Sequence, residues 1–163
     1  MVYGDSLENC SPEKEAQVRI LHPPLMKIAI AASMFFHKEM RSVKEALEQR
    51  GHVVRVPMGT EEEVPIEAKP GISKDELIAA KIEYDFIRKH FKNIEESDAI
   101  LILNYPRKGI GGYIGGNTFL EMGHAFGLGK QIFVLYPLPV MDYEAEMHAM
   151  QPVVLNGDVT IIK

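Results

Sequence analysis

Glu121 is a carboxylate that stands where α/β proteins commonly place ligand chemistry. It lies in a helical pattern that begins at Thr118, directly after the run Gly109–Asn117, in which five glycines fall within eight positions. The apolar run Ala99–Leu103 comes before the glycines. A strand, a glycine loop and a helix start are typical of an anion or nucleotide site, because glycine lets the backbone approach a ligand and first-turn N–H groups point at negative charge.

Two interpretations of Glu121 remain open. Thr118-x-x-Glu121 has the spacing of a capping box, in which the glutamate caps the helix and performs no chemistry. Alternatively, the positive end of the helix keeps the carboxylate ionised beside the loop. An ionised, positioned carboxylate can attack the anomeric carbon of a sugar or stabilise its oxocarbenium character. Spacing alone favours the capping role of Glu121, whereas its position after a central strand favours a catalytic role.

The glycine loop is either a flexible turn into the helix or a cradle for a ligand, and we favour the cradle. The loop is not a P-loop, since no Gly-Lys-Ser/Thr follows, and its spacing differs from the dinucleotide fingerprint. Arg107 and Lys108 place two cations at its start. A strand-end serine and the loop itself give the candidate substrate-binding residues: Ser33, Gly109, Gly111, Gly112, Tyr113, Gly115, Gly116, Asn117 and Thr118.

Composition narrows the class of protein. The 163 residues are 46% hydrophobic and 25% charged, and the formal net charge is −5, which argues against a general nucleic-acid binder. The sequence has no apolar run near the roughly 20 residues that cross a bilayer. Cys10 is the single cysteine and the six histidines form no helical His-x-x-x-His pair, so we expect no metal and no cofactor. A reducing cytoplasm is the expected compartment.

Strands and helices alternate along the chain, which predicts an α/β fold with a parallel sheet. Residues 1–25 are expected to form a loose N-terminal tail, and residues 26–163 a single domain. The expected strands cover 27–32, 52–56, 98–103, 131–135 and either 153–155 or 159–162, and the expected helices cover 37–50, 73–96, 118–128 and 143–150. Residues 57–71 form a long loop that we interpret as a lid or a partner surface.

Several of these motifs together resemble a known family. They are the run Ser97–Leu103, the helix start with Gly116, Asn117, Thr118, Glu121, Gly123 and Ala125, and the following Gly129-Lys130. With the opening strand–helix–strand pattern, they resemble the nucleoside 2-deoxyribosyltransferase family and the related deoxynucleotide N-hydrolases over most of residues 27–136. The resemblance implies a flavodoxin-like three-layer sandwich with a five-stranded parallel sheet, and a homodimer or larger homo-oligomer. It also implies N-glycosidic bond cleavage through a covalent deoxyribosyl-glutamate, with Glu121 as the nucleophile.

The chain departs from the family pattern at two helper positions. Family enzymes carry an Asp eight residues before the strand-opening Asp98, and His90 stands there. They often carry an Asp or Ser six residues before the nucleophile, where this chain has Gly115. His90 is therefore a candidate ligand contact with a catalytic role, the alternative being a surface or interface residue.

A weaker similarity also indicates cleavage of an N-glycosidic bond. Gly115-Gly-Asn-Thr118-x-x-Glu121 is similar to the glycine loop of the phosphoribohydrolases that release cytokinin bases, although it is one residue shorter. The leading hypothesis is a nucleoside 2-deoxyribosyltransferase-like N-glycosidase acting on a nucleoside or a nucleoside 5′-monophosphate. The expected partner is this small molecule, with no nucleic acid and no membrane. The alternative is a non-catalytic nucleotide-binding or sensing module of the same fold.

Overall fold

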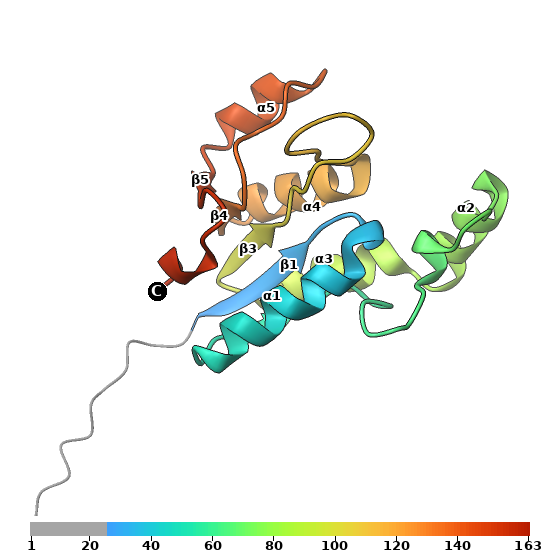
Figure 1. Cartoon of the computed structure of the whole chain (residues 1–163), viewed down its shortest axis with the longest axis horizontal. Coiled ribbons are helices and arrows are strands. Elements are labelled where there is room, and N and C mark those ends of the chain that lie inside the picture. The colour runs from blue at the N-terminus through green and yellow to red at the C-terminus, as the bar shows by residue number, and fades with distance from the viewer. Residues whose placement is uncertain (1–25) are drawn as a thin grey trace, which may run out of the picture.

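The computed structural model describes residues 26–163 (Figure 1). The expected tail, residues 1–25, lies outside the described residues, and Cys10 lies there too. Five parallel strands form one sheet in the order β2-β1-β3-β4-β5. The strands are β1 (Lys27–Ala31), β2 (Val53–Arg55), β3 (Ala99–Ile102), β4 (Gln131–Val134) and β5 (Val153–Val154). This order is that of the flavodoxin-like fold, so the expected fold class is confirmed.

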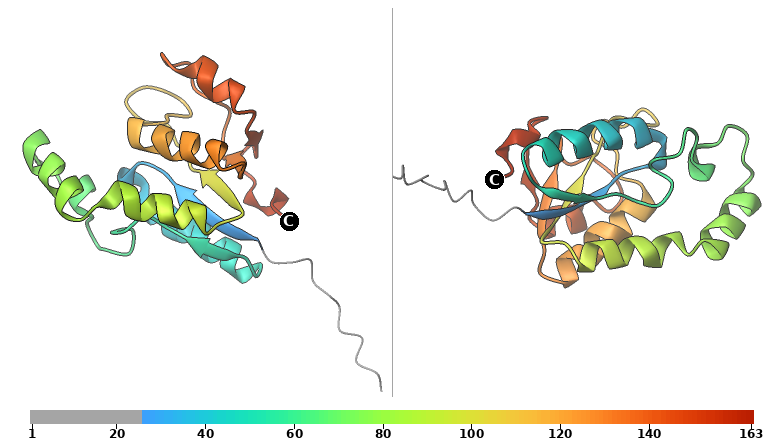
Figure 2. Two further views of the ribbon diagram at one scale, coloured as in Figure 1. Left: turned by 180° about the vertical axis from the view of Figure 1, so that it is seen from behind. Right: turned by 90° about the horizontal axis from the view of Figure 1, so that it is seen from below.

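Helices cover both faces of the sheet, and Figure 2 shows α1 on one side and α3 on the other. The helices are α1 (His37–Gln49), α2 (Lys74–Glu83), α3 (Phe86–Glu95), α4 (Gly116–Gly127) and α5 (Glu144–Ala149). Strand β1 shows why two layers form, because alternate side chains point to opposite faces. Ile28 and Ile30 pack in one cluster with Met40 of α1, whereas Ala29 and Ala31 pack in the other with Met122 of α4.

The last strand resolves one open alternative. Residues 153–154 pair with β4, whereas Val159–Ile161 form a short 3-10 helix, η3. The first helical turn after β1 is also a 3-10 helix, η1 (Met34–Phe36). No helix within residues 26–163 is long and apolar enough to cross a membrane.

The expectation of one long helix over residues 73–96 is wrong in one respect, because two helices, α2 and α3, form there. Asp85 adopts a left-handed backbone conformation, with φ of 52°, and no helix continues through such a residue. The start is as expected, since Ser73 and Glu76 form a capping box. Helix α2, which precedes the break, projects away from the sheet (Figure 1). Ile82 of α2 is therefore 75% exposed.

The loop between β2 and α2 begins at Pro57 and contains a 3-10 helix, η2 (Ile66–Ala68). Its acidic cluster contacts α1: Glu61 forms a 2.7 Å ion pair with Lys44, and the Glu62 carbonyl accepts a hydrogen bond from Arg41. The first part of the loop is thus tied to the body. The second part, with η2, continues toward α2 and brings that helix to the carboxyl end of the sheet.

Candidate functional site

A cavity of about 290 Å³ lies at the carboxyl ends of β1 and β3. Strand β2 is added on one side of β1 and β3 on the other, so the strand order reverses between β1 and β3, which is where open α/β sheets bind ligands. Its walls come from the segment after β1, from η2 and α2, and from the loop and first turn of α4. The lining residues are Ala32, Ser33, Met34, Glu67, Leu77, Lys81, Arg107, Lys108, Tyr113, Gly115, Gly116, Asn117 and Thr118.

The first turn of α4 forms one wall of this cavity. The helix begins at Gly116, two residues earlier than expected, and Gly115 at the N-cap has no side chain with which to cap it. The N–H groups of a helix's first turn lack intrahelical partners, so they suit an anion. Thr118 and Glu121 lie inside the helix and form no capping box, so the capping interpretation of Glu121 is wrong.

Two basic residues face this helix start from the preceding loop. The Arg107 guanidinium donates a hydrogen bond to the Ser33 hydroxyl and lies 4.9 Å from the centroid of the Phe35 ring. The Lys108 ammonium lies 5.5 Å from the centroid of the Tyr113 ring. Both cations therefore line the cavity with an aromatic ring close by.

Glu121 lies one helical turn behind the cavity wall. Its side chain is 2% exposed, and its Oε1 accepts a 2.8 Å hydrogen bond from Nδ2 of Asn117, which does line the cavity. Its Oε2 is buried with no hydrogen-bond partner among residues 26–163. A buried polar atom of this kind is costly and is typical of functional positions.

Burial governs the protonation of this carboxyl. It raises the pKa of Glu121 to about 8, with a smaller increase from the negative charge of Glu67 and an opposing decrease from Lys81. Desolvation disfavours the charged form, and here it outweighs the favourable field of the helix start. The expectation that the helix keeps Glu121 ionised is therefore wrong for the unliganded chain: at pH 7 the carboxyl is held mainly as the acid.

The early glycines of the loop lie outside the cavity lining. Gly109 and Gly112 have positive φ values of 74° and 68°, and Gly111 does not. A Cβ on Gly112 would come closer to the carbonyl oxygen of Pro137 than real Cβ atoms do. Gly112 is thus required by the turn and by a close backbone approach, while Gly115 and Gly116 form the cavity wall.

His90 is neither a surface residue nor part of the cavity lining. It is 2% exposed on α3, with Nδ1 3.3 Å from Nδ2 of Asn93 and with Nε2 lacking a hydrogen-bond partner in the described chain. Burial lowers the pKa of His90 to about 4, and the nearby backbone of Ile30 offsets part of that decrease. The ring is therefore neutral at pH 7 and packs toward the sheet.

Sequence reasoning missed two charged residues of the cavity, Glu67 of η2 and Lys81 of α2. They form a direct ion pair, and both side chains are largely buried. Fourteen residues and a change of element separate them, so no local spacing signals the pair. Sequence reasoning also missed Asn104, whose buried amide donates hydrogen bonds to the carbonyls of Tyr136 and Pro137 at 2.9 and 3.2 Å and ties the loops after β3 and β4 together.

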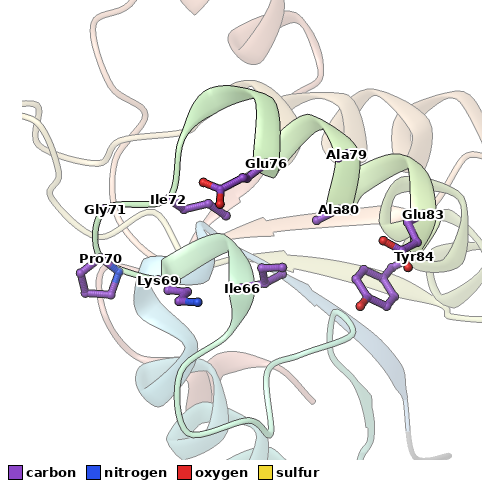
Figure 3. A pocket seen from close by; sticks show the side chains of 10 residues that line it. All are labelled: Ile66, Lys69, Pro70, Gly71, Ile72, Glu76, Ala79, Ala80, Glu83 and Tyr84. Carbon is purple, nitrogen blue, oxygen red and sulfur yellow. The ribbon is translucent and has the colours of Figure 1, made fainter.

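A second cavity, of about 420 Å³, lies within the segment from Ile66 to Tyr84, and Figure 3 shows the side chains that line it. Its acidic residue Glu76 is already engaged in the capping box with Ser73. This cavity does not include the glycine loop or α4. Within residues 26–163, no three or more His, Cys, Asp or Glu side chains gather as a metal site would require.

Comparison with known proteins finds similarity at a low level. No family model matches the chain, and no curated protein sequence does. A CMP N-glycosidase of Clostridium botulinum superposes with a TM-score of 0.44 at 16% identity, covering 78% of this chain and 84% of that enzyme.

Two further solved structures are 2-deoxyribosyltransferases. The enzyme of Leishmania mexicana gives a TM-score of 0.45 at 19% identity, and the match covers 68% of this chain and 63% of that enzyme. The enzyme of Bacillus psychrosaccharolyticus gives a TM-score of 0.47 at 18% identity, and the match covers 83% of this chain and 94% of that enzyme. The assignment of the fold rests on the strand order of this chain itself.

Proposed function

We propose that the chain is an N-glycosidase that cleaves or transfers the base–sugar bond of a nucleoside or nucleoside 5′-monophosphate, with Glu121 as the nucleophile. The observation that carries the proposal is the state of the Glu121 carboxyl. One oxygen is held by Asn117 and the other has no partner in residues 26–163, at the first turns of the helix that walls a polar cavity. A carboxylate oxygen that is oriented and unpaired is suited to attack an anomeric carbon.

The remaining groups fit the other parts of such a substrate. The free N–H groups at the start of α4, with Arg107 and Lys108 beside them, favour a phosphate group. Tyr113 is the loop tyrosine that lines the cavity, and its ring offers a face for a base. Tyr105, in contrast, packs against Phe36 and Tyr136 away from the lining. These features support a nucleoside 5′-monophosphate over a free nucleoside.

One observation favours the alternative function, a nucleotide-binding or sensing module without catalysis. Glu121 is not itself among the lining residues, and burial holds it mainly protonated at pH 7. A protonated carboxyl is a poor nucleophile, so turnover requires that ligand binding ionise and uncover it. Binding alone requires neither step.

Base release from a panel of nucleosides and monophosphates tests the proposal, with Glu121→Gln as the diagnostic variant. Gln keeps the size of the side chain and can still accept the hydrogen bond from Asn117, but it cannot form the glycosyl ester. We expect Glu121→Gln to lose at least about 1000-fold in kcat while still binding the ligand. The matched control is Glu146→Gln, an exposed glutamate on α5. Wild-type turnover in Glu121→Gln would exclude the nucleophile, and ligand binding without any wild-type turnover would favour the sensing module.

We also propose a homodimer or larger homo-oligomer, with α4 as part of the contact surface. The segment Met141–Met150 is not exposed as a face, since Met147 is fully buried and Met141, Tyr143 and Met150 pack against the core. Helix α4 instead exposes large apolar side chains, among them Phe126 at 53%. Light scattering at micromolar concentration tests this, and a species of 18.3 kDa alone would contradict it.

A further inference from the structure

This inference rests on the proposed function and concerns the second carboxyl that such a reaction needs. We propose that Glu67 is the acid–base catalytic residue of this site: it protonates the leaving base and then takes the proton from the incoming water or acceptor. Lys81 is its positioning residue. Neither residue lies at a helper position of the family pattern, where this chain has His90 and Gly115.

The placement of Glu67 is the first argument. Among the described residues that line the cavity, Glu67 is the one carboxylate, and it faces the same space as the first turn of α4. Its side chain is 14% exposed, so it is withdrawn from bulk water but still borders the cavity. His90, the other candidate for proton transfer, is buried on α3 outside this lining.

The ion pair with Lys81 is the second argument. Lys81 reaches Glu67 from a different element, so the pair fixes η2 against α2 and holds the carboxyl over the cavity. The same two residues are the charges to which the protonation of Glu121 responds, Glu67 favouring the protonated form and Lys81 the ionised form. The protonation of Glu121, behind the cavity wall, is therefore coupled to the charges of Glu67 and Lys81, which line the cavity.

The reacting state has Glu67 as the acid and Glu121 as the carboxylate. In the unliganded chain burial keeps Glu121 protonated. Substrate binding releases that proton to solvent, while Glu67 holds the proton that the leaving base receives. Glu121 then forms a bond to C1′ as the C1′–N bond breaks, the electron pair of that bond goes to the base, and the Glu67 proton goes to the base nitrogen.

The second half of the reaction restores both groups. Water attacks C1′, the bond from C1′ to Glu121 breaks with its electron pair returning to the carboxylate, and the proton of the water goes to Glu67. The net change is hydrolysis of the nucleotide to sugar phosphate and base, with no other reactant. When an acceptor base replaces water, its N–H proton goes to Glu67 and the result is transfer.

Leaving-group dependence tests this role, because an acid is needed only for a leaving group that must be protonated. The wild-type chain and Glu67→Gln are assayed on a nucleoside 5′-monophosphate and on the 4-nitrophenyl glycoside of the same sugar phosphate, whose phenolate leaves unprotonated. We expect kcat of Glu67→Gln to fall about 100- to 10,000-fold on the nucleotide, and formation of the glycosyl ester from the 4-nitrophenyl substrate, read as the nitrophenolate burst, to change less than about 10-fold. Glu62→Gln, an exposed glutamate of the same loop, is the matched control.

Azide provides a second readout that a structural role would not affect. In Glu67→Ala the glycosyl ester formed from the 4-nitrophenyl substrate should persist, and azide, which attacks without losing a proton, should release it as the glycosyl azide. Equal losses on both substrates, or no loss on the nucleotide, would overturn the role of Glu67 while leaving the proposed function intact. A wild type that cleaves neither substrate would instead overturn the proposed function and this inference with it.

Discussion

The side-chain amide of Asn117 donates a 2.8 Å hydrogen bond to Oε1 of Glu121, so a residue that lines the cavity orients a carboxyl buried behind it. The two residues are four positions apart on α4 and therefore lie on one face of the helix. A ligand that contacts Asn117 is thereby coupled to the carboxyl. Asn117 was expected to bind substrate directly, and the structure adds this contact with Glu121.

Asn117→Ala is predicted to impair catalysis more than binding. The change removes a hydrogen bond that favours the ionised form of Glu121, and such bonds to a charged group contribute about 1.5–3 kcal/mol. We expect kcat for base release to fall about 10- to 100-fold with a small change in KM. The acid limb of the kcat–pH profile should move to higher pH, because less of the nucleophile is ionised. A loss confined to KM would assign Asn117 to substrate binding alone.

Glu121→Gln is predicted to stabilise the fold increasingly as pH rises. The folded-state pKa of Glu121 is about 8 and the unfolded value about 4.5. Below pH 4.5 the carboxyl is protonated in both states and contributes no pH dependence. Between the two values the unfolded chain ionises while the folded chain does not, so wild-type stability falls as pH rises, and above pH 8 the full cost is present.

Gln does not titrate, so the variant lacks this loss. The difference in the free energy of unfolding, variant minus wild type, should grow by about 5 kcal/mol between pH 4.5 and pH 8, at about 1.4 kcal/mol for each unit between the two pKa values. Urea denaturation at a series of pH values measures it, with Glu146→Gln as the control. A difference that does not change with pH would mean that Glu121 is ionised in the folded chain.

Gly112→Ala is predicted to destabilise the loop, whereas Gly111→Ala is not. Gly112 has a φ of 68° and its added Cβ would clash with the backbone of Pro137, while a Cβ on Gly111 meets nothing within 4 Å. A strained backbone conformation and a clash with a main-chain atom together cost at least about 2 kcal/mol. We expect Gly112→Ala to lower the melting temperature by about 5 °C or more. The neighbouring variant should remain close to wild type, and similar melting temperatures for the two would contradict this explanation.

The buried strands were the most predictable part of the chain. Apolar runs such as Ala99–Leu103 are distinctive because both faces of the central strands are covered. The break at Asp85 was not predictable, since neither Gly nor Pro marks it and the apolar spacing continues across it. The exposure of Ile82 follows from that break and has no local signal of its own.

The candidate site was predictable where one segment builds it and not where two segments meet. The helix start and Glu121 lie within a few residues of each other, so their spacing carries information. The pairing of Glu67 with Lys81 depends on how η2 packs against α2, and the protonation of Glu121 depends on burial. Local sequence cannot report either, because both are properties of the packed structure.

The last prediction concerns the ligand that the cations select. Arg107 and Lys108 line the same cavity as the first turn of α4 with its free N–H groups, and a nucleoside without phosphate leaves these donors and charges unused. Nucleoside 5′-monophosphates should therefore bind better than the matching nucleosides. At 100 times its dissociation constant a ligand stabilises the fold by about 2.7 kcal/mol, which raises the melting temperature by roughly 5–10 °C.

The double variant Arg107→Gln/Lys108→Gln should lose most of the melting-temperature shift caused by a monophosphate and keep any shift caused by a nucleoside. The control Arg88→Gln/Lys92→Gln, on exposed positions of α3, removes the same charge and should keep both shifts. Equal shifts from nucleosides and monophosphates in the wild type would show that the start of α4 does not bind phosphate.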